Sequence, residues 1–338
     1  MKRARSDAGT ASAAVVRSPD LMQHLLAFQS GIYLDLVPLH RDAAPLRRSG
    51  LLLNALADEH DAFDAVDQLL RPWYAAHGTS LLPRLLNSPS LDHMRPWVIY
   101  HAVYCGRLDA LVVVLKTRTA TTSLHALTDL MDVAAWRGHL SLLEALHDAG
   151  HSGCTTDAID NAAMCGHLDV VRFLHENRSE GSTTMAMDGA AANGHVEMVR
   201  YLHAQRSFGC TTDAMDHAAA AGHLEVVRFL HDNRTEGCTT DAMDGAATNG
   251  HVEMVRFLHD NRTEGCTTEA LDMAAKAGHL DVVLFLVANR EEGCSHDALA
   301  LAATDDIRLA LAQVRVVNHD DAMGSPTPSE IENWSEGE

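Results

Sequence analysis

The stretch AGHLEVVRFLHDNRTEGCTT (residues 221–240) returns 28 residues later, nearly unchanged, as NGHVEMVRFLHDNRTEGCTT (residues 249–268). Six units share this frame between about residues 125 and 292, and two of them, 209–236 and 237–264, differ at only five of 28 positions. A Gly-His dipeptide marks every unit, at Gly138, Gly166, Gly194, Gly222, Gly250 and Gly278. Self-similarity at a fixed period predicts a solenoid of stacked units.

Two looser copies flank the six units. VIYHAVYCGRLDALVVVL (residues 98–115) precedes them, and GCSHDALALAATDDIRLAL (residues 293–311) follows, with Asp306 where the turn glycine of the frame would fall. Each complete unit has the pattern of two short helices, so that the predicted fold is an all-α solenoid of about seven to eight helix-turn-helix repeats.

The first helix of the unit is expected over residues 239–250. Met243, Ala246 and Ala247 have the i, i+3, i+4 spacing of an apolar stripe on one helical face. Gly250 ends the helix, because glycine enters the left-handed conformation at little cost. Three residues are candidates for the N-terminal cap, and the sequence does not choose among them: Thr239, Thr240 and Asp241.

The second helix is expected over residues 251–261, with a broad apolar face of Val, Met, Phe and Leu side chains. Every first helix carries an alanine pair, as in Ala246 and Ala247, where the second helix carries larger residues. First helices can therefore approach one another closely, which predicts a curved stack with the first helices on its concave wall. All nine prolines lie outside residues 97–325, which agrees with an uninterrupted helical array.

The frame AA-x-x-GH-[LV]-[DE]-[VM]-V-R-[FY]-L resembles the ankyrin repeat, whose units carry similar Ala-Ala, Gly-His and Val-Val-x-x-Leu patterns. The resemblance covers residues 93–316, about two-thirds of the chain. It implies that Gly250 and His251 form the turn between two helices. It also implies that the histidine after each turn glycine bridges to neighbouring backbone, and that the array binds proteins.

The sequence departs from the ankyrin pattern in two ways. The T-P-L-H opening of the family is replaced by DAMD, as at residues 241–244, so the Thr–His hydrogen bond of the family does not carry over. The period is 28 residues, shorter than the usual 33. The missing residues fall in the connection between units, where we expect short loops in place of β-hairpin fingers. A leucine-rich repeat is excluded, because its L-x-x-L-x-L-x-x-N pattern does not occur.

Two histidine series and one cysteine series repeat with the frame, and we expect them to have been copied with a structural unit. The first histidine series is His139, His167, His195, His223, His251 and His279, and the second is His147, His175, His203, His231 and His259. The cysteine series is Cys154, Cys210, Cys238, Cys266 and Cys294. Because neighbouring helices pack about 8–10 Å apart, nothing in the spacing brings equivalent histidines to a common ion, and we expect no metal or other cofactor. The same separation exceeds the limit of about 7 Å between the Cα atoms of a disulfide. Cys105 and Cys165 end first helices, and the sequence shows no local partner that would make either one a nucleophile.

Four predicted second helices carry an arginine at the same position, close to acidic residues. The arginines are Arg172, Arg200, Arg228 and Arg256. This pattern predicts a helix face that is exposed to solvent. Neither a nucleotide-binding glycine motif, nor a metalloprotease H-E-x-x-H, nor a G-x-S-x-G is present. We therefore expect no enzyme activity.

Binding is expected where the copies disagree while the packing frame holds, next to the alanine pairs. Trp136 beside Arg137 is the strongest anchor, because aromatic and arginine side chains dominate interface energetics. The alternative is that Trp136 packs against the preceding, irregular unit. The candidate partner-binding residues are Trp136, Arg137, Met164, Asn161, Asn193, His217, Thr248, Asn249, Met273 and Lys276.

Composition restricts the setting. The net charge of −20 argues against nucleic acid and anionic membranes as partners, whereas protein partners remain possible. Seven cysteines, none in a C-x-x-C pair, and the lack of a convincing signal peptide favour an intracellular protein of the cytoplasm or nucleus. We expect a monomer.

The ends do not follow the period. We expect disordered tails at residues 1–17 and at the acidic residues 317–338. Between the tails, we expect a helical region at residues 18–92 and the repeat array at residues 93–316. SPDLMQHLLAFQSG (residues 18–31) faintly resembles the start of an F-box. The expected function is a scaffold that binds a partner protein on its concave face; the alternative is a substrate-recruiting adaptor of a ubiquitin ligase that uses residues 18–92.

Overall fold

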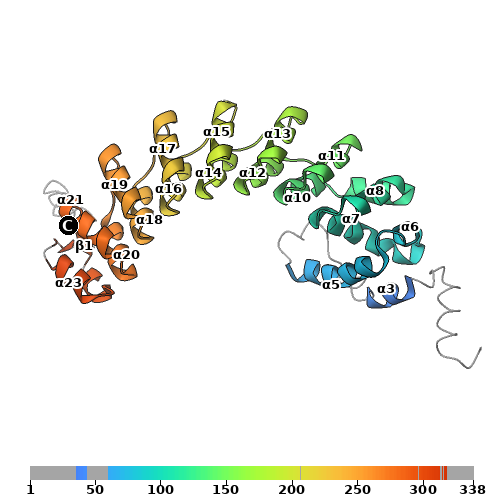
Figure 1. Ribbon diagram of the computed structural model, residues 1–338, viewed down its shortest axis with the longest axis horizontal. Helices are drawn as coiled ribbons and strands as arrows, with labels where there is room; N and C mark the ends of the chain where they lie inside the picture. Colours follow the sequence, from blue (N-terminus) through green and yellow to red (C-terminus); the bar gives the residue numbers. More distant parts are fainter. Residues whose placement is uncertain are drawn as a thin grey trace, which may run out of the picture. The chain divides into compact units, whose positions relative to one another are not determined.

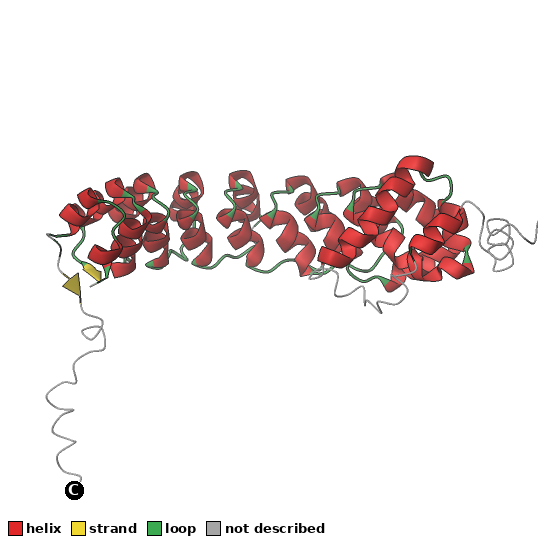
Figure 2. Ribbon diagram, turned by 90° about the horizontal axis from the view of Figure 1, so that it is seen from below, coloured by secondary structure: helices red, strands yellow, loops and turns green. Residues whose placement is uncertain are grey.

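The computed structural model describes residues 36–43 and 60–317, apart from residues 206, 296, 313 and 315. The regular secondary structure of these residues consists of helices and one short parallel pair of strands, β1 (Cys294–Ser295) and β2 (Val316–Val317) (Figure 2). The predicted all-α solenoid is confirmed. No helix among these residues combines the length and the apolar character that crossing a bilayer requires.

The helices before the regular repeats are α3 (Val37–Asp42), α5 (His60–His77), α6 (Leu82–Asn87), the 3-10 helix η3 (Pro89–Met94), α7 (Arg95–Tyr104), α8 (Leu108–Lys116) and α9 (Arg118–Ala126). Helix α5 packs on α7, and α6 packs on η3, α8 and α9. The F-box-like stretch, residues 18–31, lies outside the described residues. The predicted boundaries of the tails, the N-terminal region and the array stay predictions.

The regular repeats are helix pairs, and we call the first member of each pair the inner helix and the second the outer helix. The pairs are α10 (Leu130–Trp136) with α11 (Leu140–Asp148), α12 (Thr156–Met164) with α13 (Leu168–Asn177), α14 (Met185–Ala192) with α15 (Val196–Ala204), α16 (Asp213–Ala220) with α17 (Leu224–Asn233), α18 (Asp241–Thr248) with α19 (Val252–Asn261), and α20 (Thr268–Ala277) with α21 (Leu280–Asn289). A shorter pair follows, α22 (Ala298–Leu301) and α23 (Asp305–Leu311).

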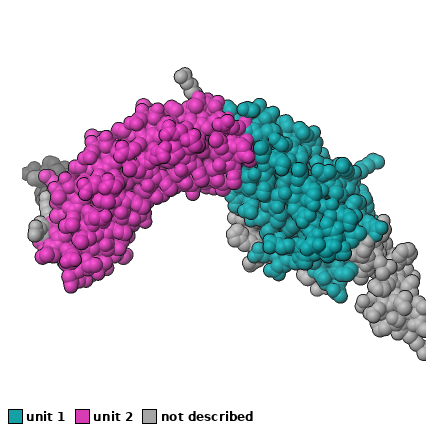
Figure 3. All heavy atoms as spheres, in the orientation of Figure 1, with its two compact units in different colours: residues 1–158, 173–180 teal, residues 159–172, 181–338 magenta. Residues whose placement is uncertain are grey.

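The chain divides into two compact units, coloured separately in Figure 3. Unit 1 comprises residues 1–158 and 173–180, and unit 2 comprises residues 159–172 and 181–338. In unit 2, the inner helices α14, α16, α18 and α20 pack side by side far more extensively than the outer helices do. They lie on the inside of the curve of this unit (Figure 1).

The alanine pairs explain why the inner helices approach so closely. In α18, Ala246 and Ala247 are fully buried, and the alanine pairs of all the other inner helices from α10 to α20 are buried to the same extent. The outer helices bury larger side chains, such as Val255 and Leu258 of α19. Small residues on one side and large residues on the other are therefore the physical source of the curvature in unit 2.

The connections between repeats are short, and the described residues between α12 and α21 contain no β-strand. Each begins after an outer helix and ends in a threonine that caps the next inner helix. The Thr239 hydroxyl accepts a hydrogen bond from the Asp241 backbone N–H (3.1 Å), and the Thr267 hydroxyl accepts one from Glu269 in the same way (3.1 Å). The first threonine is thus the cap that the sequence left open.

The same threonine joins its repeat to the preceding one. The carboxylate of Asp216, on α16, accepts hydrogen bonds from the Thr239 backbone N–H (2.8 Å) and from the Thr239 hydroxyl (2.9 Å). We call this pair of bonds the Asp–Thr joint. It occurs between Asp132 and Thr155, Asp160 and Thr183, Asp188 and Thr211, Asp216 and Thr239, and Asp244 and Thr267. Asp272 keeps only the backbone bond, from Ser295 (2.9 Å).

The joint makes use of the aspartate that ends DAMD at residues 213–216 and 241–244 and the related segments of the other repeats, where ankyrin repeats have the T-P-L-H opening. Three of its aspartates are buried, since Asp160, Asp216 and Asp244 are only 4%, 6% and 7% exposed, and Asp132 and Asp188 are half-buried. Burial raises the pKa of Asp216 and Asp244 despite the hydrogen bonds from threonine, which act in the opposite direction. Burial likewise raises the pKa of Asp132, to about 6.

Substituting Asp244→Ala is expected to destabilise the array by about 1–3 kcal/mol, because it leaves the N–H and hydroxyl of Thr267 without their acceptor. The midpoint of urea unfolding, followed by far-ultraviolet circular dichroism, measures the effect. Asp260→Ala is the matched control, since it removes the same charge from an exposed position of the same repeat. Equal effects of the two substitutions would contradict a structural role for the joint.

The raised pKa of Asp132 predicts a pH dependence of stability. Because the folded-state pKa is about 6 and the unfolded value is about 3.9, the stabilisation is complete below the unfolded value and is lost as the pH rises through 6. The wild type should therefore gain stability relative to Asp132→Asn as the pH falls from 7 to 4.5. Denaturant midpoints of the two proteins at both pH values test this, and a difference that does not change with pH would refute it.

Candidate protein-binding surface

Most of the predicted binding residues lie on the solvent-facing side of the inner helices or directly after these helices, and we call this exposed stripe the inner stripe. His217 on α16, together with Met273 and Lys276 on α20, is exposed, and Met273 exposes 37% of its surface. Asn193 and Asn249, directly after α14 and α18, are also exposed, whereas Asn161, Met164 and Thr248 are half-buried. The fully buried alanine pairs separate this stripe from the outer helices. Their role in binding a partner stays a prediction.

Part of the variation between repeats has a packing cause that the sequence did not reveal. A Cβ atom added at Gly189 would lie 3.0 Å from the Met164 Cβ, and one added at Gly245 would lie 2.7 Å from the Ala220 Cβ. A residue before one alanine pair therefore faces the residue after the alanine pair of the preceding repeat. Met164 accordingly has a role in helix packing, as the large partner of a glycine.

Three of the predicted residues also hydrogen-bond to backbone. The side-chain amide of Asn249 donates to Gly245 O (3.1 Å) and to Ala220 O of the preceding repeat (3.0 Å). Asn193 donates to Gly189 O (2.9 Å), and the hydroxyl of Thr248 donates to Asp244 O (2.8 Å). These side chains support the helix ends, which leaves Arg137, His217, Met273 and Lys276 as the exposed members of the predicted set for which the described structure shows no such bond.

Trp136 and Arg137 contact an aromatic ring of the preceding helix pair. The indole of Trp136 lies edge-on to Tyr104, with 6.0 Å between centroids, and is half-buried. The Arg137 guanidinium lies over the same Tyr104 ring at 4.6 Å, and the residue is exposed. The structure thus contains the packing alternative for Trp136. A role of this pair in binding a partner stays a prediction.

The outer helices are linked by a different set of contacts. An exposed arginine lies over the aromatic ring of the next repeat at 4.7 to 5.1 Å. The pairs are Arg172 with Tyr201, Arg200 with Phe229, Arg228 with Phe257, and Arg256 with Phe285. Each contact contributes about 0.5–1 kcal/mol at an exposed site. The predicted solvated face is therefore exposed and also bridges repeats.

The second histidine series lies on the same side. The imidazole of His231 meets the Phe257 ring edge-on at 5.7 Å, and His203 meets Phe229 in the same way at 5.4 Å. These rings pack against aromatic neighbours of the next repeat, which is the structural role expected of copied histidines.

The first histidine series packs on the turns. Within unit 2, a Cβ atom added at Gly222, where φ is +79°, would lie 2.7 Å from the His251 ring, and Gly194 stands in the same relation to His223. In unit 1, His139 Nε2 lies 3.1 Å from Tyr104 O, the bridge to neighbouring backbone that the resemblance implied. The turn glycines are therefore needed for their left-handed conformation and also for the ring above them.

The cysteine series lies in the connections between successive repeats. Cys154, Cys210, Cys238, Cys266 and Cys294 are buried and free. Burial raises the pKa of Cys210 to about 11, so the thiol stays protonated at neutral pH. Arg234 next to it pairs with Glu236, and that hydrogen bond is the largest influence lowering the pKa of Glu236. The expectation of small packing residues agrees with this arrangement.

Cys105 has a contact that the sequence analysis did not identify. Its Sγ lies 3.6 Å from Nε2 of His101, one helical turn earlier. The same Nε2 lies 3.1 Å from Oδ1 of Asp67, on α5. The spacing of His101 and Cys105 was a visible signal for this contact, whereas Asp67 lies 34 residues earlier in a region without repeats.

The contact between turn glycine and histidine predicts the effect of a methyl group. Gly222→Ala adds the cost of a left-handed alanine, about 1–2 kcal/mol, and forces the His251 ring to move, which adds about 1–3 kcal/mol. Gly181→Ala is the matched control, because Gly181 has φ of +76° but nothing within 4 Å of an added Cβ. The midpoint of denaturant unfolding should decrease more for Gly222→Ala than for Gly181→Ala. Equal decreases for the two variants would exclude a role for the His251 ring.

Comparison with known proteins assigns the repeats to a family. The search of curated proteins gives no significant match. A family model described as ankyrin repeats (3 copies) matches residues 130–216, 159–244 and 215–300. These matches span α10 to α22, half of the chain, and contain all the regular helix pairs with their alanine pairs and turn glycines. The chain belongs to the ankyrin repeat family.

Proposed function

We propose that this ankyrin repeat protein is a scaffold that binds a partner protein through the exposed stripe of its inner helices. Ankyrin repeats are in general protein-binding scaffolds. The single observation that carries the proposal is the contrast within unit 2 between a buried frame that repeats and an exposed stripe that changes. Ala218, Ala219, Ala246 and Ala247 are equally buried, whereas the residues next to them, which are exposed or half-buried, differ from helix to helix.

The stripe offers chemically distinct groups at comparable positions on successive helices. His217 on α16 has as its counterpart Gly245 on α18 and Met273 on α20. A partner that spans several repeats would therefore meet a polar, a small and an apolar position in turn. Recognition of this kind depends on shape and on a few well-placed side chains, because a minority of interface residues carries most of the binding energy.

The exposed acidic residues and the small size of two surface pockets support a protein partner over a small-molecule ligand. Exposed acidic residues stand at the start of the inner helices, Asp213 on α16, Asp241 on α18 and Glu269 on α20, and would favour basic groups on the partner. The hollows beside Cys210 and Cys266 are smaller than a drug-sized ligand needs. We propose that the chain acts without catalysis, as ankyrin repeats typically do.

The remaining assignments are part of the same proposal. The cysteine thiols in the connections between repeats are free, which is consistent with a reducing compartment, the cytoplasm or the nucleus. We propose that residues 18–92 cap the array and that the chain acts as a monomer. The ubiquitin-ligase alternative depends on residues 18–31, which the structure does not describe, and no observation favours it.

The test uses two variants of the full chain in quantitative affinity capture. The inner-stripe variant carries His217→Ala, Met273→Ala and Lys276→Ala, all at exposed positions. It should lose at least tenfold of one or more proteins that the wild type captures reproducibly, because their side-chain contacts are gone. Captured proteins are quantified by mass spectrometry against the wild type.

A control variant with Asp232→Ala and Asp260→Ala changes exposed positions on the outer helices α17 and α19. It should retain the proteins that the inner-stripe variant loses. Loss of those proteins with the outer variant and retention with the inner variant would place the binding surface on the opposite face. Circular dichroism of both variants establishes that each remains folded.

A further inference from the structure

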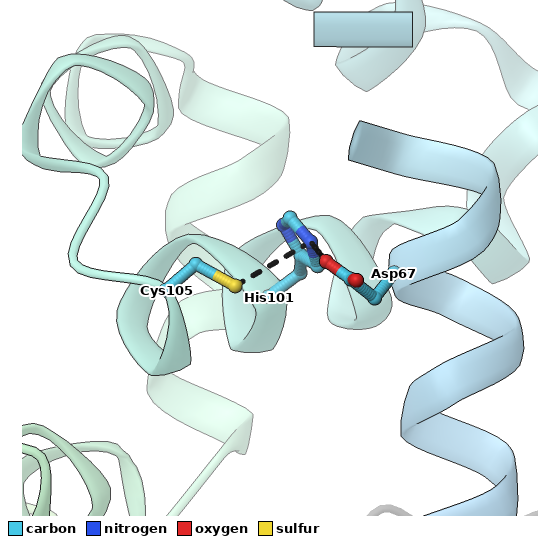
Figure 4. A group of neighbouring side chains, drawn as sticks. All are labelled: Asp67, His101 and Cys105. Atoms are coloured by element: carbon cyan, nitrogen blue, oxygen red, sulfur yellow. Dashed lines mark hydrogen bonds and ion pairs between the residues drawn. The ribbon is translucent and has the colours of Figure 1, made fainter. Parts of the chain in front are cut away.

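Three side chains of unit 1 with metal-binding chemistry converge outside the repeat frame. Asp67 projects from α5, His101 lies in α7, and Cys105 directly follows α7 (Figure 4). One ligand atom from each residue lies within 4.8 Å of the other two. His101 and Cys105 are four residues apart on a helix and its end, which places both on one face. Within the described part of the chain, this is the one such group of three.

The geometry does not suit a proton relay. In a nucleophile–histidine–carboxylate arrangement, the two ring nitrogens contact different partners. Here Asp67 Oδ1, at 3.1 Å, and Cys105 Sγ, at 3.6 Å, both face the same nitrogen, Nε2 of His101. A neutral ring offers either a proton or a lone pair there. One of the two contacts is therefore always poorly satisfied when only these three groups are present.

A cation between the three groups removes this conflict. Zinc binds thiolate sulfur at about 2.3 Å and imidazole nitrogen and carboxylate oxygen at about 2.0–2.2 Å, in tetrahedral geometry. The ligand atoms of such a site are then about 3.3–3.6 Å apart. The separations of 3.1 Å and 3.6 Å around Nε2 are close to these edges, and the third pair of ligand atoms, on Asp67 and Cys105, lies within 4.8 Å, so that side-chain shifts would complete the coordination.

The surroundings hold the ligands in place. The His101 ring is stacked with Phe63 and with Tyr74, and the ring centroids are 5.8 Å apart in both contacts. Arg71 donates to both carboxylate oxygens of Asp67, from Nη2 to Oδ2 at 2.8 Å and from Nε to Oδ1 at 3.3 Å, and so holds the carboxylate in the orientation in which Oδ1 contacts His101. Both the ring and the carboxylate are therefore oriented before any ion arrives, which lowers the entropic cost of binding.

The site is open on one side. His101 is 2% exposed, whereas Cys105 is exposed, so an ion would reach it from the cysteine side. Three protein ligands leave a fourth position for water, as in zinc sites of the catalytic type. Nδ1 of His101 is buried without a hydrogen-bond partner in the described structure. Because such outer partners contribute 10–100-fold to metal affinity, we expect binding weaker by about that factor than in a fully supported site.

We propose that Asp67, His101 and Cys105 form a binding site for a divalent cation of the zinc class, with one coordination position open to solvent. The site is independent of the inner-stripe surface, which lies in unit 2.

The test titrates Co²⁺ into the purified, metal-stripped full chain without a histidine tag. Cobalt bound by a thiolate gives a charge-transfer absorption in the near ultraviolet, which the many other histidines of the chain cannot produce. The wild type should show this absorption with a stoichiometry of one, and Zn²⁺ should displace it. Cys105→Ser should abolish it, and the substitution affects an exposed residue, which favours retention of the fold.

Cys165→Ser is the matched control. Cys165 stands before the turn glycine Gly166 as Cys105 stands before Gly106, but Asn161 takes the place of His101. This variant should keep the absorption unchanged, and Zn²⁺ should raise its melting temperature as it does for the wild type but not for Cys105→Ser. No thiolate absorption in the wild type, its persistence in Cys105→Ser or its loss in Cys165→Ser would overturn the proposal.

Discussion

The whole array depends on the close contact between neighbouring inner helices. A helix pair of 28 residues cannot bury its apolar face alone, so each pair is stabilised mainly by the next one. The fully buried alanine pairs allow the approach, and Gly245 shows how tight it is, since even a methyl group there would meet Ala220. Larger residues at these positions would separate the inner helices and with them every other contact between repeats.

The Asp–Thr joint adds direction to this non-directional packing. One aspartate carboxylate accepts two hydrogen bonds from a threonine 23 residues later, and the same hydroxyl caps the following helix. The burial that raises the pKa of these carboxylates is a cost, and charge-assisted bonds of about 1.5–3 kcal/mol each offset part of it. A packed apolar surface tolerates sliding, whereas a pair of bonds to one carboxylate fixes the register between repeats.

The period and the small residues made the fold predictable from sequence. Gly250 and the alanine pairs have one dominant physical use each, so their repetition indicated the turn and the packed helix directly. The joint was not foreseen, although aspartate and threonine recur in every unit, because the pattern does not say which distant residue a side chain meets.

The candidate sites were harder to predict. The variable positions included Met164, whose size is matched to Gly189 of the next repeat, and a sequence does not separate such compensation from binding. The group of Asp67, His101 and Cys105 was also missed, because Asp67 belongs to a region without repeats and reaches the others only through the packing of α5 on α7.

A connection that is the same at successive junctions makes the modules interchangeable. If residues 211–238 were excised, Thr239 would take the place of Thr211 opposite Asp188, with the same 23-residue separation. Recombination between nearly identical coding segments could therefore lengthen or shorten the chain by whole modules without a new interface having to evolve. The near-identity of residues 209–236 and 237–264 is the trace that such copying leaves.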